Sequence, residues 1–167
     1  MNIEEEENSK LHINKTKMNC DDKLGDLPLP LDTMVSGSAL GIVGHSGSGK
    51  TTLMASLLGA NKKKGVRQSF KKLFDNVVII SPSLHTISSG IFKGIPENKK
   101  FSVFDNEALD RVDELTEEEV DDDETNYTLL ILDDVSSQLK KNRQLEKRLT
   151  SLFQNRRHKQ LTIWVIS

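Results

Sequence analysis

The eight residues from Gly44 to Thr51 carry the most specific chemistry in the sequence. They read Gly-His-Ser-Gly-Ser-Gly-Lys-Thr and match the pattern G-x-x-x-x-G-K-[ST]. Glycines let the backbone wrap around an anion, while successive N–H groups and the N-terminus of a following helix point at phosphate oxygens. The alternative is a Gly/Ser-rich turn before a helix, without a role in nucleotide binding. We predict instead that this loop binds the phosphates of a nucleotide.

Two side chains of the loop have individual roles in this interpretation. Lys50 is expected to reach the β- and γ-phosphates of ATP, and the Thr51 hydroxyl to be a ligand of Mg²⁺. His45 is expected either to face solvent as a filler or to take part in sensing the nucleotide. The predicted nucleotide-binding residues are Gly44, His45, Ser46, Gly47, Ser48, Gly49, Lys50, Thr51 and Thr52.

Hydrolysis needs a metal-holding acid and a group that orients water, and the segment 129–134 offers both. It reads Leu-Leu-Ile-Leu-Asp-Asp, which is the Walker B pattern of an apolar strand that ends in carboxylates. Asp133 is predicted to hold the Mg²⁺ shell and Asp134 to polarise the attacking water. Many strands end in Asp, so this pattern gains its weight from the phosphate-binding loop upstream.

A third element is the run Asn155-Arg156-Arg157-His158 before the last apolar segment. Cations at the end of a helix offset its macrodipole without any catalytic role. Alternatively, Arg156 or Arg157 enters a neighbouring subunit's nucleotide site as an arginine finger, which stabilises charge on the γ-phosphoryl group in the transition state. That role would require a ring of subunits.

Strands that alternate with helices are expected to position these groups. Continuous Val/Ile/Leu runs are typical of strands buried on both faces of a parallel sheet, and four such runs occur, at 39–43, 77–80, 129–132 and 162–166. Apolar residues at helical spacing predict helices over 51–58, which presents Leu53, Met54, Leu57 and Leu58, and over 138–155, which presents Leu145, Leu149, Leu152 and Phe153. The sequence therefore predicts an α/β fold.

Two segments are predicted to lie outside the core. Residues 1–36 are rich in polar residues and contain Leu27-Pro28-Leu29-Pro30, so they read as a flexible N-terminal arm. Residues 113–125 hold nine acids and no base, which indicates a solvated acidic insert. The rest of 37–167 is predicted to be one P-loop ATPase domain.

The composition sets further bounds. Cys20 is the one cysteine, so no internal disulfide can form, and the acidic start lacks the features of a signal peptide. The longest apolar runs are strand-sized, which predicts no membrane span and an intracellular location. The net charge of −2 conceals an asymmetry, because the acidic runs 4–7 and 113–124 contain 13 of the 25 acids and no base.

These motifs resemble those of two protein families. The loop and its continuation to Leu53 resemble ABC transporter ATPases, but these carry a helix of the LSGGQ type shortly before Walker B, where this chain has acids. We therefore disfavour that family. The fuller resemblance, from about residue 38 onward, is to the genome-packaging ATPases of poxviruses and other large DNA viruses, within the FtsK–HerA superfamily. It is carried by the loop at 44–51, Val-Val-Ile-Ile-Ser-Pro-Ser at 77–83, Asp133-Asp134-Val135, and the segment from Asn155 to Ser167.

The packaging resemblance implies a P-loop NTPase fold of the RecA/ASCE type. This is a three-layer sandwich with a mainly parallel sheet, in which the four predicted strands have the order 1-4-3-2. The family order 5-1-4-3-2 would lack its fifth strand here, which leaves the edge of the first strand uncovered. In the family a polar sensor residue, usually Gln, follows the last strand. Because this sequence stops at Ser167, a truncated product is one expectation.

The same resemblance implies an activity and partners. The expected protein is a homo-oligomeric, Mg²⁺-dependent ATPase that moves double-stranded DNA, irrespective of sequence, into a capsid, with a capsid protein as possible partner and the host cytoplasm or the virion as location. Lys50, Asp133, Asp134 and Arg157 carry over as catalytic residues, with Arg157 best matching the arginine finger.

Charge gives the DNA prediction modest support. Basic clusters occur at Lys62, Lys63, Lys64, Arg67, Lys71 and Lys72 and at Lys140, Lys141, Arg143, Lys147 and Arg148. Such clusters suit salt-sensitive binding to a phosphate backbone, although solvated lysine faces explain them as well. Two other functions remain open, a nucleotide-binding fragment without hydrolysis and a P-loop ATPase that does not act on DNA.

Overall fold

The computed structural model describes residues 37–58, 74–85, 92, 94–118, 126–140 and 142–167. Five strands and four α-helices follow one another as β1 (Ala39–Ile42), α1 (Lys50–Leu58), β2 (Asn76–Ile80), β3 (Lys100–Phe101), α2 (Asn106–Glu117), β4 (Thr128–Asp133), α3 (Ser136–Leu139), α4 (Arg143–Asn155) and β5 (Leu161–Ile166). One 3₁₀ turn, Glu97–Lys99, precedes β3.

The five strands form one parallel sheet in the order β1-β5-β4-β2-β3. The four predicted strands correspond to β1, β2, β4 and β5, so both the α/β class and their predicted order are confirmed. The sequence did not predict β3, because its two residues are too short to stand out as an apolar run.

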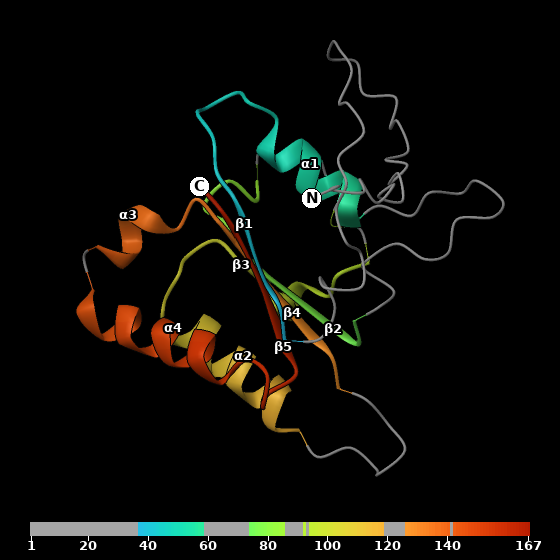
Figure 1. Ribbon diagram of the computed structural model, residues 1–167, viewed down its shortest axis with the longest axis vertical. Helices are drawn as coiled ribbons and strands as arrows, with labels where there is room; N and C mark the ends of the chain where they lie inside the picture. Colours follow the sequence, from blue (N-terminus) through green and yellow to red (C-terminus); the bar gives the residue numbers. More distant parts are fainter. Residues whose placement is uncertain (1–36, 59–73, 86–91, 93, 119–125, 141) are drawn as a thin grey trace, which may run out of the picture.

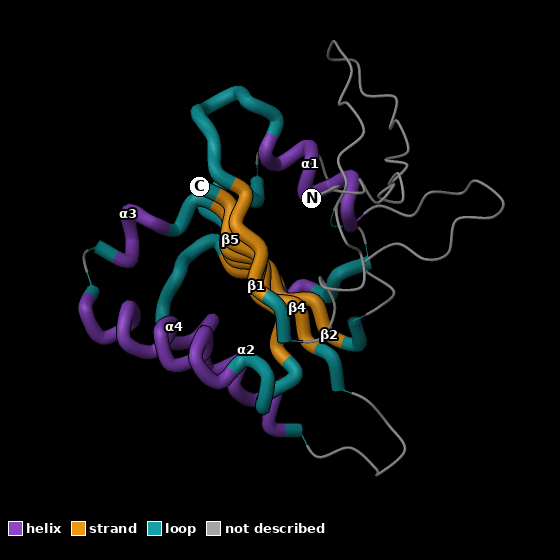
Figure 2. Tube along the Cα trace, viewed as in Figure 1, coloured by secondary structure: helices purple, strands orange, loops and turns teal. Residues whose placement is uncertain are grey.

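Helices cover both faces of the sheet, with α2 and α4 on one side and α1 on the other (Figures 1 and 2). Successive residues of a strand point to opposite faces. On β4, Leu130 and Leu132 therefore pack with the leucines of α2 and α4, whereas Leu129 and Ile131 pack with Met54 and Leu58 of α1. This arrangement is the predicted three-layer sandwich.

Strand β1 differs from its prediction. It pairs with β5 alone and forms an edge of the described sheet, and its residues are alternately exposed and half-buried. Leu40 and Ile42 pack on the α1 side, while Gly41 has open space on the other side and Val43, just after the strand, is 84% exposed. The prediction that this run is buried on both faces was wrong, because no described helix covers the second face of β1.

The acidic segment also differs from its prediction over its first residues. Helix α2 extends to Glu117, begins after Asp105, whose side chain accepts a hydrogen bond from the Ala108 N–H, and buries Leu109, Val112 and Leu115. Residues 113–117 are therefore helical, with Leu115 buried while Glu114 and Glu117 remain exposed. Residues 119–125 lie outside the described residues.

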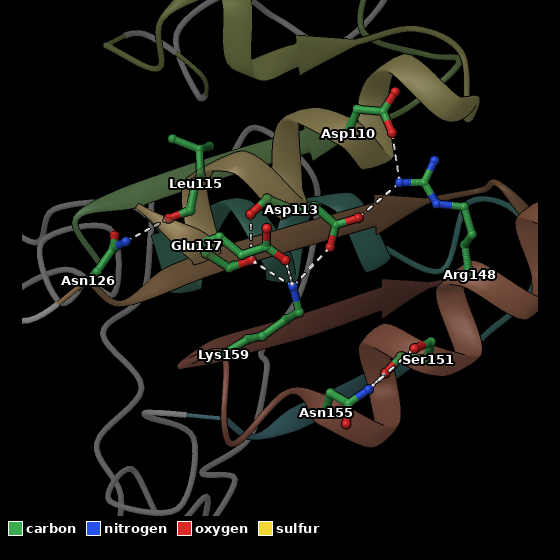
Figure 3. Close-up of polar contacts among 10 residues, drawn as sticks. Asp110, Asp113, Leu115, Glu117, Asn126, Arg148, Ser151, Asn155 and Lys159 are labelled. Carbon is green, nitrogen blue, oxygen red and sulfur yellow. Dashed lines mark hydrogen bonds and ion pairs between the residues drawn. The ribbon is translucent and has the colours of Figure 1, made fainter. Parts of the chain in front are cut away.

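Three acids of α2, Asp110, Asp113 and Glu117, pair with bases that come from α4 and from the segment before β5 (Figure 3). Arg148 bridges Asp110 (2.8 Å) and Asp113 (2.9 Å). Lys159 bridges Asp113 (3.1 Å) and Glu117 (2.8 Å). This network fastens α2 to the elements that carry the second basic cluster, so Arg148 already has partners within the chain.

The predicted helix 138–155 is two helices, α3 and α4. The side chain of Asn142 accepts hydrogen bonds from the Gln144 and Leu145 N–H groups, which is the geometry of an N-cap and begins a new helix. The apolar face of α4 is confirmed, because Leu145, Leu149 and Leu152 are buried.

Several predicted features lie outside the described residues. They are the arm 1–36 with Cys20, the basic cluster 62–72 and Lys141. Within the described part of the chain, no helix has the length and apolar character needed to cross a bilayer.

Candidate nucleotide-binding site

A pocket of about 550 Å³ opens at the carboxyl edge of the sheet. The carboxyl ends of parallel strands meet at this edge, where open α/β sheets usually bind their ligands. The loop after β1, the end of β4 and the turn after β2 all contribute. The lining residues are Gly44, Ser46, Gly47, Ser48, Gly49, Lys50, Thr51, Thr52, Ser83, Asp133, Asp134 and Ser167.

The loop geometry requires its glycines. Gly49 has φ +86°, a conformation that L side chains rarely adopt, and its carbonyl oxygen accepts the first hydrogen bond of α1 from the Leu53 N–H at 2.8 Å. A Cβ on Gly44 would lie 2.7 Å from Ser48 Oγ. The backbone therefore curls tightly against α1, whose first N–H groups have no partner within the helix.

Lys50 Nζ holds the loop closed. It donates hydrogen bonds to the carbonyl oxygens of Gly44 (2.7 Å) and His45 (3.1 Å). The ammonium group thus lies inside the curve of the loop and lines the pocket. His45 contributes its carbonyl oxygen to this arrangement and is not among the pocket-lining residues, and its contact with nucleotide stays a prediction.

Asp133 is the last residue of β4 and is buried, with 5% of its surface exposed. Its Oδ2 atom accepts a hydrogen bond of 2.8 Å from Ser81 Oγ, and Ser81 follows the neighbouring strand β2. The register explains the contact, because Ile80 lies beside Leu132 in the parallel ladder. Asp133 thus reaches the pocket with one oxygen already engaged.

Asp134 is exposed and has φ +52°, in the left-handed region. Its N–H donates to the Ile166 carbonyl oxygen at 2.9 Å, so β5 holds this backbone conformation. A non-glycine residue in this region carries backbone strain, which is often found at functional sites. The turn leaves Asp134 in the pocket beside Asp133.

The residues of this pocket fit a magnesium ion. Thr51 and Asp133 offer the oxygen ligands that Mg²⁺ prefers. Among the residues described, no group of three or more His, Cys, Asp and Glu side chains could hold a metal. A magnesium ion at this site would therefore depend on phosphate oxygens of the nucleotide as well as on the chain.

The predicted arginines lie at the opposite edge of the sheet, before β5 begins. Arg156 Nη1 donates to the Phe153 carbonyl oxygen at 2.6 Å, near the end of α4, where a cation offsets the helix macrodipole. Arg157 is exposed, and its backbone lies beside Gly37, which precedes β1. Neither arginine lines the pocket of its own chain.

Two pocket residues, Ser83 and Ser167, had no predicted role, and neither had Ser81, which does not line the pocket but contacts Asp133. Ser81 and Ser83 follow β2, and Ser167 follows β5. The available signal was the position of these serines shortly after buried strands, because such positions share an edge in a parallel sheet. Ser167 also bonds through its carbonyl oxygen to the Gly44 N–H at 3.0 Å, which ties the loop to the end of β5.

Comparison with known families supplies the assignment. The family model described as ABC transporter matches residues 32–161, which include both the loop and the Asp133-Asp134 pair. The chain belongs to the ABC transporter family. Our expectation against this family, which rested on the missing LSGGQ-type helix, was therefore wrong. No curated protein and no solved structure matches the chain.

Membership of the ABC transporter family makes the protein an ATP-binding P-loop NTPase, and ATP hydrolysis is the general activity of that family. The match contains Lys50, Thr51, Asp133 and Asp134. It ends at Leu161, after the arginine pair.

Proposed function

We propose that this protein is a Mg²⁺-dependent ATPase that works as an oligomeric motor and moves double-stranded DNA into a viral capsid. One observation supports the ATPase part above all others. Lys50, Thr51, Asp133 and Asp134, from two elements far apart in sequence, line a single pocket.

Each of these groups has a task in phosphoryl transfer. Lys50 exchanges its bonds to the loop carbonyls for the phosphate oxygens of ATP, and the loop N–H groups bind the same anion. Thr51 and Asp133 are the residues that would hold Mg²⁺, which when bound neutralises charge on the β- and γ-phosphates. The Asp134 carboxylate orients the attacking water and accepts its proton.

The position of Arg157 supports an oligomer. An exposed arginine at the amino edge of the sheet is unable to reach its own pocket, which lies at the carboxyl edge. In a head-to-tail ring, the amino edge of one copy would face the pocket of the next. Arg157 of one copy would then stabilise the transition state in its neighbour.

The DNA part of the proposal is supported by the resemblance to packaging ATPases and by charge. Lys140, Arg143 and Lys147 are exposed around α3 and α4, and none forms an ion pair with another described residue. A surface of this kind suits sequence-independent contact with phosphates.

The family match favours a second candidate function. ATP hydrolysis by this domain would then drive a transporter partner rather than DNA. We rank this function second because the resemblance to packaging ATPases runs from the loop at 44–51, through Val-Val-Ile-Ile-Ser-Pro-Ser at 77–83, to the segment from Asn155 to Ser167.

The deciding experiment measures ATP turnover of the full chain with and without random-sequence duplex DNA, at low and at high salt. We expect DNA to raise turnover at low salt and the effect to fade as salt rises. The double variant Arg143→Gln/Lys147→Gln should lose the stimulation, whereas Gln154→Ala, an exposed change on the same helix, should keep it. Equal ATP turnover with and without DNA at every salt concentration would contradict the DNA part of the proposal and favour the transporter-type function.

A further inference from the structure

Ser81 lies at the carboxyl edge of the sheet, where β2 and β4 end beside the pocket. Its hydroxyl group has a defined direction. The Oγ–H donates to Asp133 Oδ2 at 2.8 Å. The same oxygen accepts a hydrogen bond from the Ser83 N–H at 3.2 Å. Because a carboxylate is only an acceptor and an amide N–H only a donor, the hydroxyl proton must point at Asp133.

The contact is fully enclosed. Ser81 has no exposed surface and Asp133 has 5%, so water does not compete for the bond. A second bond from the Leu84 N–H to the Ser81 carbonyl oxygen, at 3.2 Å, closes the turn and fixes the serine backbone. The hydroxyl is thus held from both sides.

The consequence concerns the other oxygen of Asp133. With Oδ2 engaged by Ser81, Oδ1 accepts no hydrogen bond from any described residue. Ligating carboxylates are commonly held by such outer hydrogen bonds, which set their orientation and affinity for metal. Ser83, two residues on, lines the same pocket.

We propose that Ser81 is the positioning residue for the magnesium ligand Asp133. Its hydroxyl holds one carboxylate oxygen so that the other is presented to the Mg²⁺ that accompanies ATP. This inference rests on the proposed ATPase function. It gives the turn after β2 a role in metal binding, while recognition of the phosphates themselves stays with the loop after β1.

The test separates metal binding from nucleotide binding. The affinity of the full chain for a non-hydrolysable ATP analogue is measured by calorimetry with Mg²⁺ and with EDTA, and the ratio of the two dissociation constants gives the magnesium effect. Ser81→Ala should reduce this ratio about 10-fold and leave the affinity in EDTA unchanged. Ser81→Thr, which keeps the hydroxyl, should retain most of the ratio.

Two controls address folding. Ser81→Cys keeps the size of the side chain but donates only weakly, so it should act like Ser81→Ala without leaving a cavity. Thr128→Val removes another fully buried hydroxyl, one that has no hydrogen-bond partner among the described residues and lies at the far end of β4. It should leave the magnesium effect unchanged. Fluorescence of Trp164, the one tryptophan, reports whether each variant is folded.

The outcomes are distinguishable. A wild type that binds no nucleotide overturns the proposed function and this inference with it. A wild type with a magnesium effect that Ser81→Ala and Ser81→Cys both retain overturns the inference alone. In the Asp133→Asn background, adding Ser81→Ala should change the ratio little further, since the serine acts through this carboxylate. An additive loss would mean that Ser81 acts on the site in another way.

Discussion

The Lys50 ammonium group is bonded to the Gly44 carbonyl oxygen at 2.7 Å, at the two ends of the phosphate-binding loop. This bond holds the loop in its curved form. A lysine whose side chain bonds across its own loop fixes the shape of the loop and also supplies positive charge at the phosphate site. Phosphate binding must exchange bonds to carbonyl oxygens for bonds to charged oxygens, which are stronger.

This relationship predicts a large effect of Lys50→Ala on binding. Hydrogen bonds to charged groups contribute about 1.5–3 kcal/mol, so the affinity for ATP should fall by about 10- to 100-fold. Calorimetric titration with ATP and Mg²⁺ measures the change. Gln154→Ala, on the exposed face of α4, is the control and should bind as the wild type does. An unchanged affinity in Lys50→Ala would mean that nucleotide binds elsewhere.

Asp134→Asn should separate binding from turnover. The amide keeps the size of the side chain but neither attracts nor accepts the proton of the attacking water. Turnover should fall about 100-fold or more while the dissociation constant for ATP stays within a few-fold of the wild type. Single-turnover phosphate release and equilibrium titration supply the two numbers. A variant that hydrolyses ATP at the wild-type rate would remove Asp134 from the mechanism.

The position of Arg157 predicts complementation between two inactive variants. Arg157→Ala keeps its own pocket but lacks the finger, while Lys50→Ala keeps the finger but lacks a working pocket. In mixed oligomers, the intact pocket of the first should be completed by the arginine of the second, so turnover should recover on mixing. Each variant alone should be strongly impaired. Failure to recover at any ratio, although mixed oligomers form, would contradict a role in a neighbouring site.

The network between α2 and α4 predicts a loss of stability at alkaline pH. Partial burial opposes the charge on Lys159, but hydrogen bonds to Glu117 and Asp113 outweigh it and hold the pKa of Lys159 above its ordinary value. The stabilisation is complete below the unfolded-state pKa of about 10.4 and disappears as pH rises through the higher folded-state pKa.

Denaturant unfolding at several pH values measures this effect. The free energy of unfolding should fall above about pH 10 in the wild type and less steeply in Lys159→Met. Lys147→Met, which changes an exposed lysine without a described ion pair, should follow the wild type. The same slope in all three proteins would mean that the network contributes no pH dependence.

The parts of the fold that could be predicted from the sequence are those whose pattern reflects burial on both sides. The runs 77–80, 129–132 and 162–166 are central strands. Their continuous apolar character is typical of strands that are buried on both faces. The run 39–43 is also continuously apolar but lies at an edge of the described sheet, which depends on the order of the strands and not on the residues of the run. The loop 44–51 was predictable because its spacing is dictated by phosphate geometry.

Other features depended on contacts between distant segments. Helix α2 was missed because its acids suggested repulsion, although Leu109, Val112 and Leu115 carried a helical spacing. Arg148 and Lys159 neutralise those acids, and no local pattern reveals that pairing. Ser81 lies in the motif at 77–83, but the sequence assigns it no role, since its partner Asp133 is brought beside it only by the sheet register.

The central claim is that this pocket hydrolyses ATP, and the initial rate of phosphate release from Mg²⁺–ATP tests it most directly. The rate is measured on the full chain in the presence of duplex DNA, for the wild type, Lys50→Ala and the control Thr128→Val. We predict release by the wild type and by Thr128→Val, and at least about a 10-fold lower rate in Lys50→Ala. The same rate in all three proteins, or no release by the wild type at any protein concentration, would contradict the account.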